Sequence, residues 1–451
     1  MRLIHWRDTL RIACFHLLLC DWLYVRHKSL ANCRKRSSRD GSSRHAFERK
    51  QDMQEQKKPS WGPLEKRFGG EPHPRKLLAL DGGGIRGILT LQVLIKMEEV
   101  LREKSRQGEK FRLCNFFDYI GGTSTGAIIA AGLALGMSAK ELSNFYIKTG
   151  PAMFDKSFIL FRLRHLYESQ PLATELQKTF GKDTTLFPEY LKCLLLVVTR
   201  NVTTDSPWPI SSNPFAWYNL PHRDDCNLCI PLWQLVRAST AAPIYFAPEV
   251  IQWDPNDPSK TFVFEDGGLT PYNNPAFLLA RMATHSAYHL NWQTGEDKLL
   301  VMSVGTGAAP RVDAEVYSSG KSAFTNLTNF PAALMYGAQV DQDINCRTVG
   351  RCLHGAPIDR ELGDLIPRDE VGNLIPLSEN LGRQFLYARY NAELSAKWLS
   401  DHGLGEVDAA KVAQLDSVEH LHDLVRVGQK LAEEVKLEHF GLDRFGHFEE
   451  V

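Results

Sequence analysis

Asp81-Gly82-Gly83-Gly84-Ile85-Arg86-Gly87 is the stretch that decides the fold. A short apolar run at 76–80 precedes it, as expected for a buried strand that enters a tight turn. Residues 88–101 follow with apolar side chains at helical spacing. The stretch therefore predicts a strand, a glycine turn ordered by Asp81, and a helix. Bare backbone amides at such a helix start can stabilise the negative charge that develops during acyl transfer.

A second glycine-rich stretch, Gly122-Thr123-Ser124-Thr125-Gly126, has the G-x-S-x-G form of a nucleophile elbow. A predicted strand at 116–120 precedes it, and a predicted helix rich in small residues follows at 127–135. Flanking glycines permit a turn backbone that other residues resist, so that the Ser124 hydroxyl projects from the turn. We therefore predict Ser124 as a nucleophile, with the Thr125 amide as a further oxyanion donor.

Far downstream, Glu265-Asp266-Gly267-Gly268 places a carboxylate in a glycine-rich turn after a predicted strand at 262–264. With the two earlier motifs, this order resembles that of the patatin-like phospholipases, serine lipid acyl hydrolases with a Ser–Asp dyad. The resemblance covers roughly residues 74–310 and includes the blocks 238–246 and 303–307.

The resemblance implies that Asp266 takes the proton of Ser124 directly, without a histidine. An unassisted carboxylate is a weak base at neutral pH, so burial should raise the pKa of Asp266. The other residues that the resemblance places in the site are the oxyanion-loop glycines Gly82, Gly83 and Gly84, the bracing Arg86, the motif glycine Gly87, and the turn glycines Gly122, Gly126, Gly267 and Gly268. We expect no metal ion or cofactor, because the chain has no calcium-loop pattern and no convincing set of zinc ligands.

Further apolar runs of strand length at 191–198 and 299–304 alternate with helical patterns, one of them at 232–241. This alternation predicts a three-layer α/β/α fold with a mainly parallel central sheet. Beyond about residue 320 we expect a helical C-terminal extension, with helices at 382–399 and 418–440. The expected domains are a basic, disordered leader (1–73), a patatin-like catalytic domain (74–310), and the helical extension packed on it (311–451).

Charge is unevenly distributed along the 451 residues, although the formal net charge is zero. Residues 1–70 carry 16 Lys+Arg against 7 Asp+Glu. A basic leader suits either an anionic membrane or a nucleic acid, and charge alone does not choose between them. The resemblance implies a lipid ester substrate with transient membrane-surface contact and no nucleic acid.

The apolar run at 12–25 is too short and too polar for a membrane-spanning helix, and no clean signal-peptide cleavage site follows it. Nine scattered cysteines, including a lone Cys226-x-x-Cys229, do not form a disulfide framework. We therefore expect a cytoplasmic or peripherally membrane-associated protein.

Two other function classes compete with a hydrolase. Gly82, Gly84 and Gly87 also fit the dinucleotide-binding pattern G-x-G-x-x-G of an oxidoreductase. That pattern asks for an acidic residue at the end of the next strand, whereas Glu98 and Glu99 fall inside a predicted helix. A catalytically silent lipid-binding or scaffold protein on the same fold would be expected to lose some of the motif residues.

Two side-chain groups have competing interpretations. His285 and His289 follow the Asp266 turn and are the candidates for a Ser–His–Asp triad, but surface or packing roles fit their context better. A loop rich in aromatic residues and proline forms either a lid or bilayer-contacting surface, or packs on the body of the protein; its members are Trp208, Pro209, Phe215, Trp217 and Tyr218.

Overall fold

The computed structural model describes residues 58–154, 171–243, 246–254, 256–308 and 323–449. The chain divides into two compact units, Met1–Gln51 and Asp52–Val451, and all described residues belong to the second. The apolar run at 12–25 and residues 1–57 of the expected leader therefore lie outside the described residues. Residues 58–73 differ from the disordered leader that the sequence predicts: helix α3 (Glu65–Phe68) forms there, and Trp61, Leu64 and Phe68 are buried in a hydrophobic core, so order begins before residue 74. In the described part of the chain, no helix is long and apolar enough to cross a membrane.

A nine-stranded sheet forms the centre of the described unit, in the order β5-β6-β3-β2-β1-β7-β9-β8, with β4 paired to β3. The six strands from β3 to β8 run parallel, and β4 and β6 are antiparallel to β3. Their bounds are β1 Arg75–Leu80, β2 Tyr119–Thr123, β3 Leu194–Asn201, β4 Ser206–Ser211, β5 Glu249–Gln252, β6 Thr261–Asp266, β7 Leu299–Val304, β8 Arg351–His354 and β9 Leu386–Tyr390.

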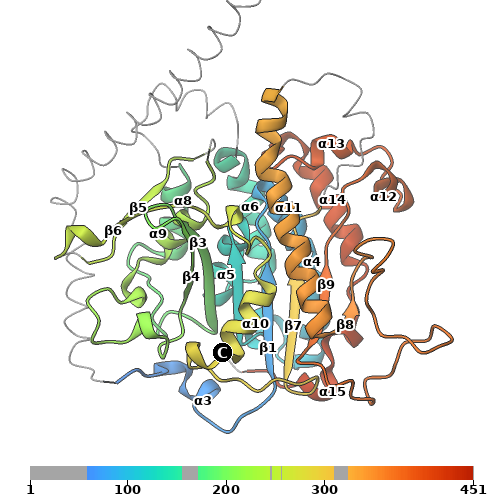
Figure 1. The fold of residues 1–451 in the computed structure, drawn as a ribbon, viewed down its shortest axis with the longest axis horizontal. Helices are drawn as coiled ribbons and strands as arrows, with labels where there is room; N and C mark the ends of the chain where they lie inside the picture. The colour runs from blue at the N-terminus through green and yellow to red at the C-terminus, as the bar shows by residue number, and fades with distance from the viewer. Residues whose placement is uncertain (1–57, 155–170, 244–245, 255, 309–322, 450–451) are drawn as a thin grey trace, which may run out of the picture. The chain divides into compact units, whose positions relative to one another are not determined.

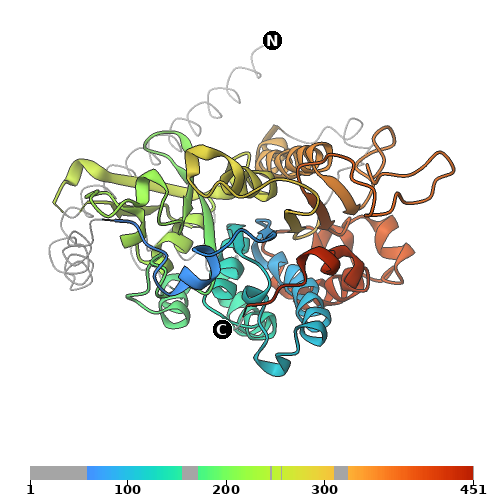
Figure 2. The same ribbon diagram turned by 90° about the horizontal axis from the view of Figure 1, so that it is seen from below.

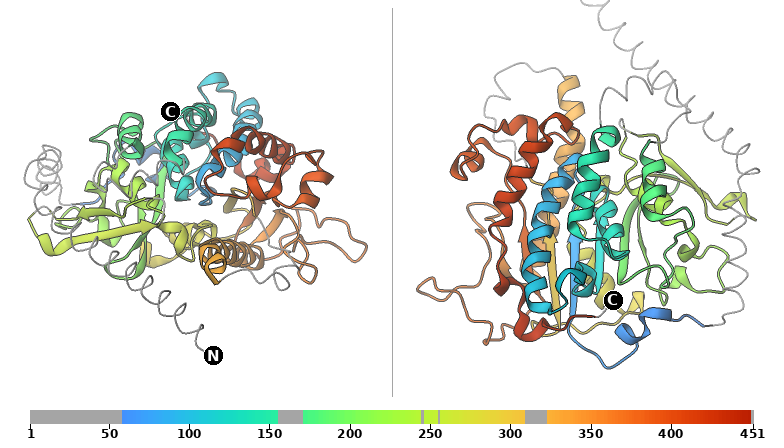
Figure 3. Two further views of the ribbon diagram at one scale, coloured as in Figure 1. Left: turned by 90° about the horizontal axis from the view of Figure 1, so that it is seen from above. Right: turned by 180° about the vertical axis from the view of Figure 1, so that it is seen from behind.

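Helices cover both faces of the sheet, which confirms the three-layer α/β/α prediction (Figures 1 and 3). One face carries α10 (Ala276–Thr284) and α11 (Ala323–Val349). The other carries α4 (Gly87–Ser105), α5 (Thr125–Ala134), α6 (Ala139–Phe154), α8 (Pro171–Phe180), α9 (Leu232–Ser239) and α14 (Leu421–Ala432). Figure 2 shows the same layers from below.

Strand β1 shows why the sheet needs two helical layers. All six of its residues are buried, and the side chains of its four apolar residues alternate between two hydrophobic cores. Leu78 and Leu80 belong to one core, and Leu77 belongs to the other. A parallel strand covered on both faces typically has a continuous run of apolar residues, and Leu77–Leu80 form such a run.

The predicted helix at 382–399 is wrong in its first half. Residues Leu386–Tyr390 form strand β9, which pairs with β7, and only Ala396–Asp401 is helical (α12). The five β9 residues are all buried, so their apolar pattern lacks the one-sided periodicity that separates a strand from a helix. The predicted helix at 418–440 is confirmed in its centre, as α14. A domain boundary near residue 310 stays a prediction, but the sheet continues across it.

Candidate active site

Ser124 occupies a sharp turn between β2 and α5, as the elbow motif predicts. Its backbone has φ 54° and ψ −121°, a region that L residues rarely adopt. The turn is tight enough that a methyl group on Gly122 would lie 2.1 Å from the carbonyl oxygen of Gly126. A methyl group on Gly126 would lie 2.3 Å from the carbonyl oxygen of Leu80. Both flanking positions therefore require glycine.

The Ser124 hydroxyl donates a 2.6 Å hydrogen bond to Oδ2 of Asp266, 142 residues away in the sequence. Asp266 is the last residue of β6, and its Oδ1 accepts a 2.7 Å hydrogen bond from the Gly268 amide. Burial raises the pKa of Asp266 to about 6, although the hydrogen bonds from Ser124 and Gly268 oppose the shift. The carboxyl group can thus act as a base near neutral pH.

No histidine among the described residues hydrogen-bonds to Ser124 or Asp266. His285 and His289 are exposed at the end of α10, where the Nδ1 atom of His285 accepts from the Ala287 amide. These positions agree with the surface roles expected for the two histidines. The geometry therefore brings together a serine and a carboxylate without the imidazole of a triad.

The glycine loop before α4 lies beside the serine. A methyl group on Gly82 would lie 3.2 Å from Cβ of Ser124. The Gly82 amide is already used, because it donates a 3.1 Å hydrogen bond to the Asn273 carbonyl. Within the described residues, the amides of Gly83, Gly84 and Thr125 have no hydrogen-bond partner. The free donors beside Ser124 thus differ from the expected set, which included Gly82.

Arg86 holds this loop from behind. Its guanidinium donates to the carbonyl oxygens of Gly83, at 3.4 Å, and Ala413, at 3.3 Å. Gly84 has φ +60°, and a methyl group there would lie 2.1 Å from the Leu415 carbonyl oxygen. The segment around 413–415 therefore packs directly on the loop. These contacts fit the bracing role that the sequence predicts for Arg86.

The family model for patatin-like phospholipase matches residues 78–280. A cGAMP-activated phospholipase of Vibrio cholerae is 30% identical over 325 residues, which cover 68% of this chain and 82% of that protein. An intracellular phospholipase A2 of Caenorhabditis elegans is 30% identical over 251 residues, 54% of this chain and 20% of that protein. Patatin-17 of Solanum cardiophyllum is 28% identical over 264 residues, 55% and 64% of the two chains.

The chain belongs to the patatin-like phospholipase family. Membership and the phospholipases among its relatives support a lipid-hydrolase activity. The dinucleotide-binding alternative gains no support, because Glu98 is buried in α4 and accepts from the Ala139 amide, while Glu99 is exposed on the same helix.

The sequence predicts no role for two polar contacts of this patatin-like phospholipase, although one of their residues, Ser239, lies in the block 238–246 that resembles the family. Ser239, in α9, accepts a 2.9 Å hydrogen bond from the Ser124 amide and donates a 2.6 Å bond to the Val198 carbonyl. Arg389, in β9, binds both oxygens of Asp81, at 3.2 and 2.6 Å. Both contacts fix backbone next to the serine, one at the elbow and one at the glycine loop before α4. Each joins residues more than 100 positions apart.

The aromatic loop mostly packs on the body of this family member. Trp208 contacts the rings of Trp253, Phe262 and Phe264. Phe215 packs edge-on against Trp61, with ring centroids 4.8 Å apart. Trp217 and Tyr218 are 58% and 60% exposed. They follow strand β4, which runs antiparallel to β3 and leads away from the end of β3 that pairs with Asp266. A lid over Ser124 is therefore not formed by these aromatic residues.

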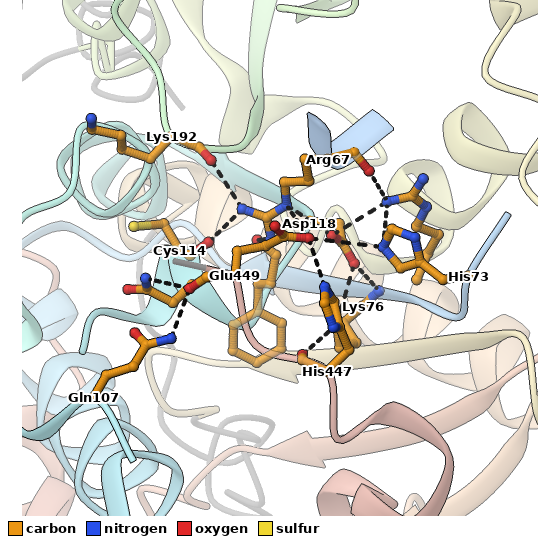
Figure 4. A network of polar contacts seen from close by, with 12 residues as sticks. Arg67, His73, Lys76, Gln107, Cys114, Asp118, Lys192, His447 and Glu449 are labelled. Carbon is orange, nitrogen blue, oxygen red and sulfur yellow. Dashed lines mark hydrogen bonds and ion pairs between the residues drawn. The ribbon is translucent and has the colours of Figure 1, made fainter. Parts of the chain in front are cut away.

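A second polar cluster surrounds Asp118 at the opposite end of β2 (Figure 4). Arg67 donates a 3.0 Å hydrogen bond to Asp118, and Arg75 and Lys76 lie 3.7 and 3.8 Å from its carboxylate. Burial alone would raise the pKa of Asp118, but the charges of Lys76, Arg67 and Arg75 prevail and lower it to about 2.

The C-terminal tail enters this cluster through His447 and Glu449. These two residues and His73 place one potential metal-ligand atom each within 4.8 Å of one another. The Nε2 atom of His73 already has a partner, because the Arg75 guanidinium donates a 2.8 Å hydrogen bond to it. The neighbouring guanidinium and ammonium groups also repel a cation. The surroundings therefore fit an ion-pair network better than a metal site.

Proposed function

We propose that this protein hydrolyses fatty-acyl ester bonds of glycerolipids through an acyl-serine intermediate. The observation that carries the proposal is the 2.6 Å hydrogen bond from the Ser124 hydroxyl to Asp266. Asp266 accepts the proton as the Ser124 oxygen attacks the ester carbonyl carbon. The amides of Gly83, Gly84 and Thr125 hold the oxyanion that forms.

The same carboxyl group serves both halves of the reaction. After attack, Asp266 returns its proton to the departing alcohol, and the acyl group stays on Ser124. Water then attacks the acyl-serine and passes a proton to Asp266. The bond between the acyl carbon and the Ser124 oxygen breaks, Asp266 returns the proton to that oxygen, and the fatty acid leaves. Loss of one oxyanion donor typically lowers kcat by about 10²–10³, so the glycine loop is a working part of the proposal.

Fatty-acid release from mixed phospholipid vesicles, without added calcium, tests the proposal. Ser124→Ala and Asp266→Asn should each lower release by about 10²–10⁴-fold, because each removes a participant in proton transfer. His285→Ala is the matched control and should retain activity, since that exposed side chain contacts neither dyad residue. Activity retained by Ser124→Ala would contradict the proposed nucleophile.

The pH dependence follows from the carboxyl group. Only ionised Asp266 can take the proton, so kcat/KM should rise with pH through an apparent pKa near 6. Rates measured between pH 4.5 and 8 on a soluble ester check this expectation. A rate that is flat across pH 6 would argue against Asp266 as the base.

Fluorophosphonate labelling separates the hydrolase from a silent scaffold protein on the same fold. An active dyad should form an adduct on Ser124, whereas a scaffold should not react there. The name of the Vibrio cholerae relative motivates assays both with and without cGAMP. Labelling that appears only with the nucleotide would show that activation of this chain is ligand-dependent.

A further inference from the structure

Asn273 lies in the segment between the Asp266 turn and α10, and its side chain is fully buried. Neither Oδ1 nor Nδ2 has a hydrogen-bond partner among the described residues. Leaving a buried amide unpaired costs folding free energy, and buried polar groups in proteins are nearly always paired. Other buried residues of the described chain leave one polar atom unpaired, but among those residues only Asn273 leaves two. Beside the proposed nucleophile, this points to a ligand that the amide binds.

The Asn273 amide lies next to two glycines, Gly82 beside Ser124 and Gly268 beside Asp266. A methyl group on Gly82 would lie 2.3 Å from Asn273 Oδ1 and 3.2 Å from Cβ of Ser124. A methyl group on Gly268 would lie 2.9 Å from the same Oδ1 and 3.1 Å from Oδ1 of Asp266. The bare faces of these two glycines therefore leave the amide close to both members of the dyad.

The backbone around Asn273 is held firmly, so the position of the amide is well defined. The Asn273 carbonyl accepts from the Gly82 amide at 3.1 Å. The preceding carbonyl, of Tyr272, accepts a 2.7 Å hydrogen bond from the Thr123 hydroxyl. These bonds attach the segment to Gly82 and to Thr123, the residue before Ser124. Loop flexibility does not account for the unpaired side chain.

Asn274 shows what a structural asparagine looks like in the same segment. It is equally buried, but its Oδ1 accepts from the Ala276 amide at 3.0 Å and the Ser303 hydroxyl at 3.3 Å. Its Nδ2 donates to the Gln339 carbonyl at 3.5 Å. Two adjacent asparagines thus differ in one respect, because only the amide beside the dyad is left free to bind something else.

Resting on the proposed function, we infer that Asn273 is a further catalytic residue, whose amide binds the water that hydrolyses the acyl-serine. In this step the water oxygen bonds to the acyl carbon, and one of its protons passes to Asp266. The bond between the acyl carbon and the Ser124 oxygen then breaks, and the serine recovers the proton from Asp266. Oδ1 of Asn273 accepts a hydrogen bond from the second O–H of the water, which fixes its direction of attack.

A variant of Asn273 should change the rates of the two half-reactions differently. The amide acts on water, and only the second half-reaction, deacylation, uses water. Asn273→Leu keeps the approximate shape of the side chain and removes the two polar atoms that could bind the water. Deacylation should slow roughly 10- to 100-fold, the size expected for a hydrogen bond lost in a water-poor site. Acylation should keep its wild-type rate, so acyl-Ser124 should accumulate.

The experiment uses the full chain and an activated p-nitrophenyl ester. Nitrophenol release measures acylation, and intact-protein mass spectrometry measures the acyl adduct. Asn274→Leu is the matched control: it should lower the melting temperature and leave the ratio of the two rates unchanged. If Asn273→Leu fails to fold, as judged by circular dichroism, Asn273→Ser replaces it. The smaller serine hydroxyl should still slow deacylation alone.

The outcomes are distinguishable. An adduct that turns over normally in the Asn273 variants, or an equal slowing of both half-reactions, overturns the role of Asn273 and leaves the dyad standing. Failure of both wild type and Asn273→Leu to form any adduct on Ser124 overturns the proposed function, and the inference with it. Selective accumulation of acyl-Ser124 in the Asn273 variant supports both.

Discussion

Asp118 and Asp266 are buried carboxyl groups at opposite ends of one sheet, and their surroundings shift their pKa values in opposite directions. Asp118 stands just before β2 among three cationic side chains, which lower its pKa to about 2. Asp266 ends β6 and accepts hydrogen bonds from Ser124 and Gly268. Burial raises its pKa to about 6, because it outweighs these two hydrogen bonds and the charge of Arg237. The surroundings of Asp118 therefore stabilise its carboxylate, whereas those of Asp266 leave its carboxyl group available for proton transfer.

Asp118→Asn should have the largest effect on stability. Removing the anion leaves Arg67, Arg75 and Lys76 close together in a buried site, which typically costs about 3–5 kcal/mol in the free energy of unfolding. Urea unfolding at pH 7, followed by tryptophan fluorescence, measures the loss. Because the folded-state pKa is depressed, the wild-type advantage is present above about pH 4 and is lost as the pH falls toward 2.

Asp205→Asn is the control for this substitution. Asp205 also pairs with an arginine, Arg200, but its side chain is 81% exposed. An exposed ion pair contributes about 0–1 kcal/mol, so the free energy of unfolding should hardly change. Equal losses in the two variants would mean that burial does not distinguish Asp118, and the comparison with Asp266 would fail.

Asp266→Asn should change stability in the opposite direction while it abolishes activity. The folded-state pKa is raised, so the stability that Asp266 contributes is fully present below about pH 4 and is lost as the pH rises through 6. At pH 8 the variant should therefore exceed wild type by about 1–3 kcal/mol in the free energy of unfolding. Thermal unfolding between pH 4 and 8 checks the trend.

Ser124→Ala separates this gain from the loss of activity. It is equally inactive in the proposed mechanism, but it keeps the buried carboxylate and removes a hydrogen bond to it. Its stability at pH 8 should not exceed that of wild type. A gain in Ser124→Ala as large as in Asp266→Asn would show that the contact between the hydroxyl and the carboxyl group, and not the carboxyl charge alone, lowers the stability of wild type.

The sequence predicts the parts of this molecule that are encoded locally. Ser124 and Asp266 each lie in a glycine motif after an apolar run, and the structure brings their side chains within hydrogen-bonding distance. Residues such as Arg389 and Asn273 carry no such pattern. Arg389 reaches Asp81 across 308 positions, and a single polar residue does not reveal a partner at that distance.

The same limit applies to the C-terminal region. Strand β9 is short and fully buried, so its apolar residues do not alternate with polar ones and fit a helix equally well. The role of β9 becomes visible only through its pairing with β7 and through Arg389. The Asp118 cluster is also assembled from residues far apart in sequence, and its cations look like ordinary surface charges until the fold buries them.

Glu449→Gln should have the smallest effect of these substitutions. Its carboxylate lies 3.9 Å from Arg67, near the limit for an ion pair, and 3.1 Å from His447, whose side chain is 58% exposed, so solvent screens the shorter contact. The backbone of Glu449 remains bonded to Asn115, through its amide at 2.8 Å and its carbonyl at 2.8 Å. We expect a loss of at most about 1 kcal/mol in urea unfolding at pH 7. A loss as large as that of Asp118→Asn would mean that the C-terminal tail supplies the charge that balances the three cations, because the backbone bonds are unchanged.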